Sequence, residues 1–207
     1  MKLARALIMI VIFFATAISA ESDKLGDLKW RNIGPANMGG RVSAIEGVVG
    51  DPNTYYVGGA DGGIFKTINN GVTFDEIFND QDAYSIGAIA VSPSDANVLW
   101  VGTGEGDPRN SVGYGRGVYR SIDGGITWVK SGLEKTERIK RIVVDPRNPD
   151  VASVCALGRE WGPNAERGVF MTYDGGKNWK KVLYINEDTG CSDITMENSN
   201  PRIMYAG

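Results

Sequence analysis

An eight-residue pattern recurs along the chain and constrains its fold more than any other feature. Its clearest copy is Ser-Ile-Asp-Gly-Gly-Ile-Thr-Trp at 121–128, and imperfect copies lie at 67–74 and 172–179. Asp-Gly-Gly between short apolar stretches is typical of a tight β-hairpin, because glycine supplies the backbone freedom that the turn needs. Three copies that begin 54 and 51 residues apart predict a repeat protein.

Each copy lies within a unit of about 50 residues that contains four short apolar stretches. In the second unit these stretches are 86–91, 98–101, 117–120 and 126–129. Four short strands per unit, with turns in register, are typical of β-propeller blades. The sequence therefore predicts an all-β fold, a partial β-propeller of about three and a half four-stranded blades. Parallel β-helices and β-sandwiches are the competing architectures, but neither predicts this recurrence.

The units define a domain organisation for residues 21–207. The predicted segments are a ring-closing strand at 28–34, blade 1 at 42–79, blade 2 at 85–133, blade 3 at 138–186, and the start of blade 4 at 191–207. Propellers typically close with 4–8 blades. We therefore expect this chain to be the N-terminal portion of a longer protein.

Residues 1–20 read as a signal peptide. Lys2 and Arg5 form a positive start, an apolar run covers 6–17, and small residues follow at 17–20. The run is short for a membrane span, and a retained N-terminal anchor is the alternative. We expect a secreted, periplasmic or cell-surface protein that meets the membrane only through this segment or a missing C-terminal part.

Composition excludes several classes of function. The chain carries 22 basic and 25 acidic residues, a formal net charge of −3, and no histidine. A nucleic-acid partner is not expected without a basic stripe. Serine–histidine or cysteine–histidine catalysis and histidine-ligated zinc are not available. No metal site or cofactor is expected, although Glu105 and Asp107 could join backbone carbonyls around Ca²⁺.

The two cysteines, Cys155 and Cys191, are candidates for a disulfide. In an exported protein a cysteine pair forms a disulfide more often than a metal or catalytic site. Whether the two thiols can meet depends on strand geometry that the sequence does not fix.

Blade topology separates scaffold residues from candidate functional ones. The hairpin turns lie on one face, and the loops between strands two and three and between blades lie on the other. We expect a structural role for the hairpin residues, with each tryptophan folded back as a plug: Ser121, Asp123, Gly125, Trp128, Asp174, Gly176 and Trp179. The other face carries acids, arginines and aromatic residues that suit sugar binding, namely Glu105, Asp107, Arg109, Tyr114, Trp161 and Arg167. The alternative is that these side chains only cap their own loops and form solvated pairs.

The octapeptides resemble Asp-boxes, the hairpin signature of bacterial sialidases, xyloglucanase-type glycoside hydrolases and sortilin-type receptor propellers. The stretches 55–67, 101–105 and 161–170 are similar to secreted bacterial sortilin-like or glycosyl-hydrolase-like repeat proteins. The resemblance covers residues 28–207. It implies that Asp61, in Ala-Asp-Gly-Gly, matches the first catalytic aspartate of xyloglucanase-type enzymes, whose partner acid comes from a second propeller. An ordinary Asp-Gly-Gly turn is the simpler alternative.

These observations leave three hypotheses for function. The first is an exported, sortilin-like propeller module whose loops bind a glycan or a polypeptide. The second is the N-terminal part of an extracellular glycoside hydrolase that acts on polysaccharide. The third is a structural piece of a larger surface protein without a ligand of its own.

Overall fold

The computed structural model describes residues 40–197 and 199–207, and within them the regular structure is almost entirely antiparallel β-strand. The exception among these residues is a single 3-10 turn, η2 (Glu134–Thr136). The expected signal peptide (1–20) and ring-closing strand (28–34) lie outside the described residues. Nowhere in the described part is there a helix long and apolar enough to cross a bilayer.

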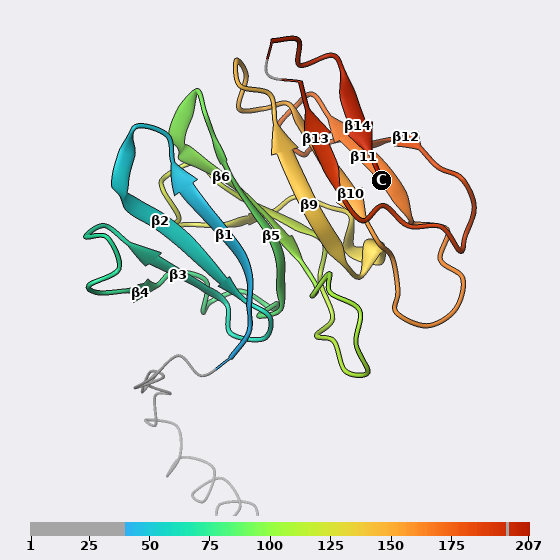
Figure 1. Ribbon diagram of the computed structural model, residues 1–207, viewed down its shortest axis with the longest axis horizontal. Coiled ribbons are helices and arrows are strands. Elements are labelled where there is room, and N and C mark those ends of the chain that lie inside the picture. The colour runs from blue at the N-terminus through green and yellow to red at the C-terminus, as the bar shows by residue number, and fades with distance from the viewer. Residues whose placement is uncertain (1–39, 198) are drawn as a thin grey trace, which may run out of the picture. The chain divides into compact units, whose positions relative to one another are not determined.

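Three four-stranded sheets and one two-stranded sheet follow one another along the chain (Figure 1). Sheet 1 contains β1 (Val42–Val48), β2 (Asp51–Gly59), β3 (Ile64–Thr67) and β4 (Asp75–Glu76). Sheet 2 contains β5 (Ile86–Ser92), β6 (Asp95–Thr103), β7 (Val118–Ser121) and β8 (Val129–Lys130). Sheet 3 contains β9 (Ile139–Val144), β10 (Ala152–Ala156), β11 (Gly168–Thr172) and β12 (Lys180–Leu183). Sheet 4 contains β13 (Ile194–Met196) and β14 (Met204–Ala206).

Within each sheet the strands are ordered as in the sequence, and the first strands of successive sheets pack side by side. In Figure 1, β1, β5, β9 and β13 succeed one another in this way. This arrangement places the sheets as blades around an axis that the first strands line. The predicted fold class, an all-β partial propeller of four-stranded antiparallel sheets, is confirmed.

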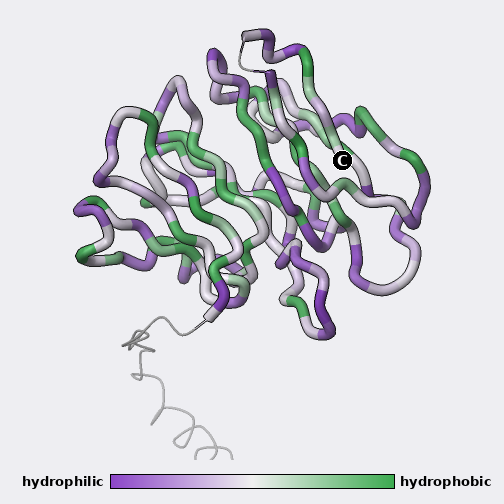
Figure 2. Tube along the Cα trace, viewed as in Figure 1, coloured by the Kyte–Doolittle hydropathy of each residue, from purple (hydrophilic) through white to green (hydrophobic). Residues whose placement is uncertain are grey.

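The core lies between neighbouring sheets. Sheet 2 is covered by sheet 1 on one face and by sheet 3 on the other, and its strand β5 is buried along its full length. Between sheets 1 and 2 the apolar cluster centres on Tyr56, Phe78 and Tyr119. Between sheets 2 and 3 it centres on Trp100 and Phe170. Figure 2 shows that the middle strands are the most hydrophobic part of the trace, as expected for strands covered on both faces.

Side-chain hydrogen bonds close the three octapeptide hairpins in the same way. In the second copy, the Ser121 hydroxyl donates to Asp123 Oδ1 at 2.7 Å and accepts from the Gly125 N–H at 2.9 Å. Asp123 in turn accepts from the backbone and hydroxyl of Thr127 at 2.9 and 2.5 Å. These bonds, with those to Thr127 the largest cause, lower the pKa of Asp123 to about 2.

The other two copies repeat this network with different residues. Thr172 and Asp174 take the places of serine and aspartate in the third copy, with a bond of 2.8 Å between them. In the first copy, Asn69 supplies the oxygen that accepts from the Thr73 N–H at 2.9 Å. An amide oxygen therefore replaces the carboxylate without loss of the turn. Gly71 in this copy has φ of +85°, which a side chain rarely adopts.

Each hairpin tryptophan packs on the preceding sheet, and Trp128 also lies 3.5 Å from the Cβ position of Gly125 in its own hairpin. Trp128 donates its indole N–H to the Ile77 carbonyl at 2.7 Å and meets Phe78 edge to face, with ring centroids 5.1 Å apart. Trp179 donates to the Ser131 carbonyl at 2.6 Å and meets Trp100 at 6.0 Å. The hairpins therefore join one blade to the next.

The last strand of each four-stranded sheet begins later than the sequence suggests. Apolar patterning favours strands at 74–77, 126–129 and 178–182, whereas β4, β8 and β12 begin at residues 75, 129 and 180. The reason is that the sixth to eighth octapeptide residues are still held in the turn by the hydrogen bonds described above.

Cys155 and Cys191 form a disulfide between β10 and the segment before β13, with Cα atoms 5.1 Å apart. Both residues are buried, in a small apolar cluster with Val169 and Ile194. The disulfide fixes sheet 4 to sheet 3.

Candidate functional site

One end of the sheets carries the residues with exposed functional groups. The β2–β3 turn (60–63), the β6–β7 loop (104–117) and the β10–β11 loop (157–167) lie at the lower end of the sheets in Figure 1, opposite the β1–β2 and β5–β6 turns. We call this end the loop face. The hairpin octapeptides lie elsewhere, in the connections between the third and fourth strands.

An ion pair between exposed Arg41 and buried Glu105 anchors the loop face. Glu105, whose side chain is 2% exposed, accepts two hydrogen bonds from the Arg41 guanidinium, at 2.8 and 2.6 Å. Its backbone N–H donates to the Ser85 hydroxyl at 3.0 Å. The hydrogen bond to Glu105 is the largest cause that raises the pKa of Arg41. Two parallel N–H···O bonds fix both side chains, so Glu105 holds the β6–β7 loop against sheet 1.

Asp61 lies on the outer side of this ion pair. Its carboxylate is 57% exposed and lies 3.9 Å from the same Arg41 nitrogen that binds Glu105. The Asp61 and Glu105 oxygens that meet at this nitrogen are therefore no more than 6.5 Å apart, the sum of the two distances. Gly113 passes directly over Asp61, where no Cβ would fit. Asp61 is thus held in place yet open to a ligand.

The separation of the two carboxylates is compatible with the carboxyl spacing in glycoside hydrolases, about 5–5.5 Å for retention and 6.5–9.5 Å for inversion. Their environments are not equivalent, however. Arg41 stands between them and neutralises Glu105 in a buried, doubly hydrogen-bonded contact. Glu105 is only 2% exposed, which leaves Asp61, 57% exposed, as the accessible acid of the two.

Three exposed aromatic side chains lie on the loop face. Tyr84, Tyr114 and Trp161 are between 68% and 73% exposed. Tyr84 is next to the β2–β3 turn, since its carbonyl accepts from the Gly63 N–H at 2.8 Å. Exposed aromatic rings offer flat apolar surfaces against which the C–H faces of sugars can pack.

The structure places the other predicted site residues in different surroundings. Asp107 forms an ion pair with Lys140, and Arg109 is exposed on the β6–β7 loop. Arg167 is buried and donates to loop carbonyls, including that of Glu187 at 2.6 Å and that of Arg159 at 3.0 Å. Glu105 and Arg167 are thus internal ties that shape their loops. Their charged groups already have partners within the chain, and their direct contact with a ligand stays a prediction.

The two acids that could have joined a calcium site, Glu105 and Asp107, each pair with a basic side chain. Glu105 binds Arg41, and Asp107 binds Lys140. Among the described residues no group of three or more cysteine, aspartate or glutamate side chains could hold a metal ion.

Two residues of the loop face were missed by the sequence analysis. Arg41 comes just before β1, and its role depends on contact with Glu105, 64 positions further along. Tyr84 belongs to the connection between sheets 1 and 2, in which the sequence analysis names no candidate residue. An exposed tyrosine immediately before an inner strand was the available signal.

Comparison with known proteins supports the fold. An ancestral GH74 enzyme matches with a TM-score of 0.68 and 22% identity over 87% of this chain. The GH74 xyloglucanase from Xanthomonas campestris matches with a TM-score of 0.61 and 18% identity over 86% of this chain. YCF48 bound to D1 peptide matches with a TM-score of 0.54 and 14% identity over 78% of this chain. The chain has a β-propeller fold.

The chain covers 23% of the ancestral GH74 enzyme, 29% of the Xanthomonas campestris enzyme and 46% of YCF48. It thus spans about a quarter of the two GH74 enzymes. No family model matches the sequence. No curated protein matches it either.

Proposed function

We propose that the loop face binds a polysaccharide and that Asp61 is its central polar contact. The observation that carries this proposal is the exposed Asp61 carboxylate beside the Arg41–Glu105 ion pair. Carboxylates bond sugar hydroxyls, and the exposed rings of Tyr84 and Tyr114 supply stacking surfaces on the same face. The protein would act as an exported, Asp-box type propeller in the periplasm, in the medium or at the cell surface.

A glycoside hydrolase of xyloglucanase type is the alternative form of this function. It would use Asp61 as one catalytic acid, in keeping with the likeness in fold to GH74 enzymes. Arg41 occupies Glu105, so the second acid would come from outside the described residues. A sortilin-like polypeptide ligand is the competing hypothesis for binding.

Calorimetric titration of the full chain with xyloglucan oligosaccharides tests the proposal. We expect Asp61→Ala to weaken binding about tenfold or more, because a hydrogen bond to a charged group contributes about 1.5–3 kcal/mol. Asp75→Ala is the matched control, since Asp75 is an exposed acid on β4 and we expect no change there.

Release of reducing ends, measured in parallel, separates binding from hydrolysis. Binding without turnover supports a binding module, whereas turnover that Asp61→Ala abolishes supports the hydrolase. The proposal that Asp61 binds polysaccharide would be contradicted if wild type and Asp61→Ala bound the oligosaccharides with equal affinity. It would also be contradicted if the protein bound unstructured peptides but not glucans.

A further inference from the structure

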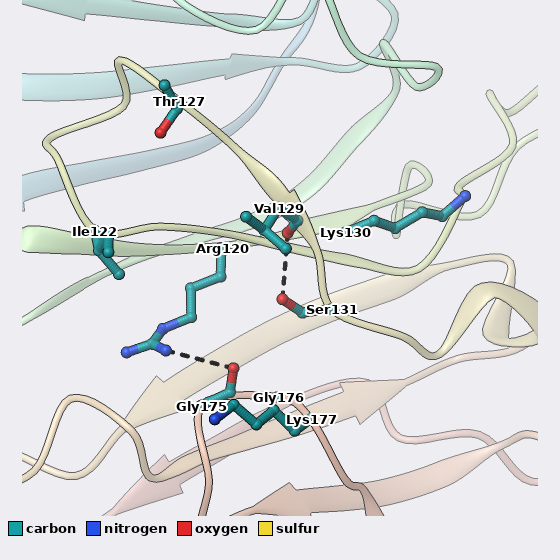
Figure 3. A pocket seen from close by; sticks show the side chains of 9 residues that line it. All are labelled: Arg120, Ile122, Thr127, Val129, Lys130, Ser131, Gly175, Gly176 and Lys177. Carbon is teal, nitrogen blue, oxygen red and sulfur yellow. Dashed lines mark hydrogen bonds between the residues drawn. The ribbon is translucent and has the colours of Figure 1, made fainter.

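A pocket of about 260 Å³ lies between the second and third hairpins, away from the loop face (Figure 3). Its surroundings differ from those of the preceding hairpin interface, because two equivalent positions of the repeat carry side chains of different size. Ile77 and Ser131 each lie three positions after the last residue of an octapeptide, and each accepts the indole N–H of the next hairpin tryptophan. They therefore occupy the same place in sheets 1 and 2.

The side chain at this place contributes differently to the two interfaces. A Cβ added to Gly125 would lie 2.7 Å from Ile77 Cδ1, so the isoleucine packs up to the next hairpin. At the second interface, a Cβ on Gly176 would lie 2.9 Å from Ser131 Cβ. Beyond this Cβ, serine has only a hydroxyl, which bonds the Val129 carbonyl at 3.2 Å. The Trp100 ring, 3.1 and 3.2 Å from the same Gly176 Cβ position, occupies the inner part of the gap between these hairpins. The pocket is lined instead by surface residues of the two hairpins and by Ser131.

The walls of the open pocket combine apolar and positively charged groups. Ile122 and Val129 are each 67% exposed and form an aliphatic side. Lys177, from the third hairpin, has no ion pair or side-chain hydrogen bond within the described part of the chain. Lys130 lies 3.3 Å from Asp82 in a solvent-exposed pair. An aliphatic wall beside an unpaired ammonium suits a ligand with an apolar body and a negative end.

The base of the pocket is rigid. Arg120 packs over the Trp100 ring, with the guanidinium carbon 5.0 Å from the ring centroid, and pairs with Asp150. Figure 3 shows its guanidinium directed toward Gly175, whose carbonyl accepts at 3.4 Å. Asp150 neutralises this arginine, so Lys177 supplies the available charge.

The interface between the first and second hairpins carries the opposite charge around Ile77, the position that corresponds to Ser131. Asp75 and Glu76 precede Ile77, where Val129 and Lys130 precede Ser131. Ile126 of the second hairpin stands where the third hairpin has Lys177. One interface is therefore acidic, and the other is apolar and basic.

We propose that this pocket binds a small organic carboxylate, with its aliphatic part against Ile122 and Val129 and its carboxylate facing Lys177. The proposal is independent of polysaccharide binding, since none of these residues belongs to the loop face.

Titration of the full chain with hexanoate, followed by NMR of the Gly175 and Gly176 amides, tests the proposal. We expect saturable shifts at both glycines. Binding of hexanamide should be weaker by a factor of about 1.4 to 5, as exposed ion pairs contribute about 0.2–1 kcal/mol. A tetrapeptide that ends in leucine, with a free or an amidated carboxyl end, tells whether a polypeptide terminus can supply the same group.

Variants taken from the repeat itself provide the controls. Ser131→Ile, which copies the first interface, is expected to weaken hexanoate binding more than tenfold. Lys177→Gln, at an exposed position, should weaken hexanoate binding about threefold. This variant keeps the test valid if Ser131→Ile fails to fold. Ile77→Ser opens the acidic interface and should create no second hexanoate site. Hexanoate shifts that are absent in wild type, or unchanged in Lys177→Gln and in folded Ser131→Ile, would overturn the proposal.

Discussion

Replacement of Trp100 by alanine is expected to lower the free energy of unfolding by about 3–5 kcal/mol. Trp100 is fully buried between sheets 2 and 3. Its indole N–H donates to the Pro149 carbonyl at 3.1 Å, and its ring meets Trp179 edge to face. The substitution would therefore remove apolar contacts, an aromatic pair and a hydrogen bond between two blades at once. Urea denaturation followed by circular dichroism measures the effect.

Trp161→Ala is the matched control for this prediction. The same chemical change at this residue removes a ring that is 73% exposed on the β10–β11 loop, so we expect a change within about 0.5 kcal/mol. Similar losses in the two variants would contradict the packing of the sheets described above.

Removal of the Cys155–Cys191 disulfide is expected to cost about 2–4 kcal/mol of stability. The bond closes a loop across 36 positions and joins sheet 3 to the two-stranded sheet 4. Without it the unfolded chain has more freedom, and β13 and β14 have fewer links to β10. Chemical denaturation of the Cys155→Ala/Cys191→Ala variant and of the wild type measures the difference.

Reductant provides the internal control for the disulfide. Because the chain has no other cysteines, dithiothreitol should lower the midpoint of the wild type and leave that of the double alanine variant unchanged. A wild-type midpoint that is the same with and without reductant would show that the bond contributes nothing.

Much of the fold could be predicted from the sequence, because the hairpin chemistry is local. Ser121 and Asp123 form their hydrogen bonds within eight residues, so the octapeptide alone specifies the turn. Regular spacing of these turns then indicated four-stranded sheets. The direction of Trp128 could not be read in this way, because its contacts with Ile77 and Phe78 cross from one repeat to another.

The candidate site was less predictable than the fold for the same physical reason. Glu105 and Arg167 are charged residue types that often bind ligands. Only the folded paths of their loops show that both are buried and have partners within the chain. Tyr114 and Trp161, in contrast, are exposed on the predicted loops. Sequence indicates which loops carry polar and aromatic groups, but burial decides which of these groups a ligand can reach.

Hydrogen–deuterium exchange of the full chain, with and without xyloglucan oligosaccharide, tests most directly whether the loop face is the ligand-binding surface. We expect slower exchange at the β2–β3 turn around Asp61 and in the β6–β7 and β10–β11 loops, with the three octapeptide hairpins unchanged. Slowing confined to the hairpins, or no slowing anywhere at saturating oligosaccharide, would contradict the account.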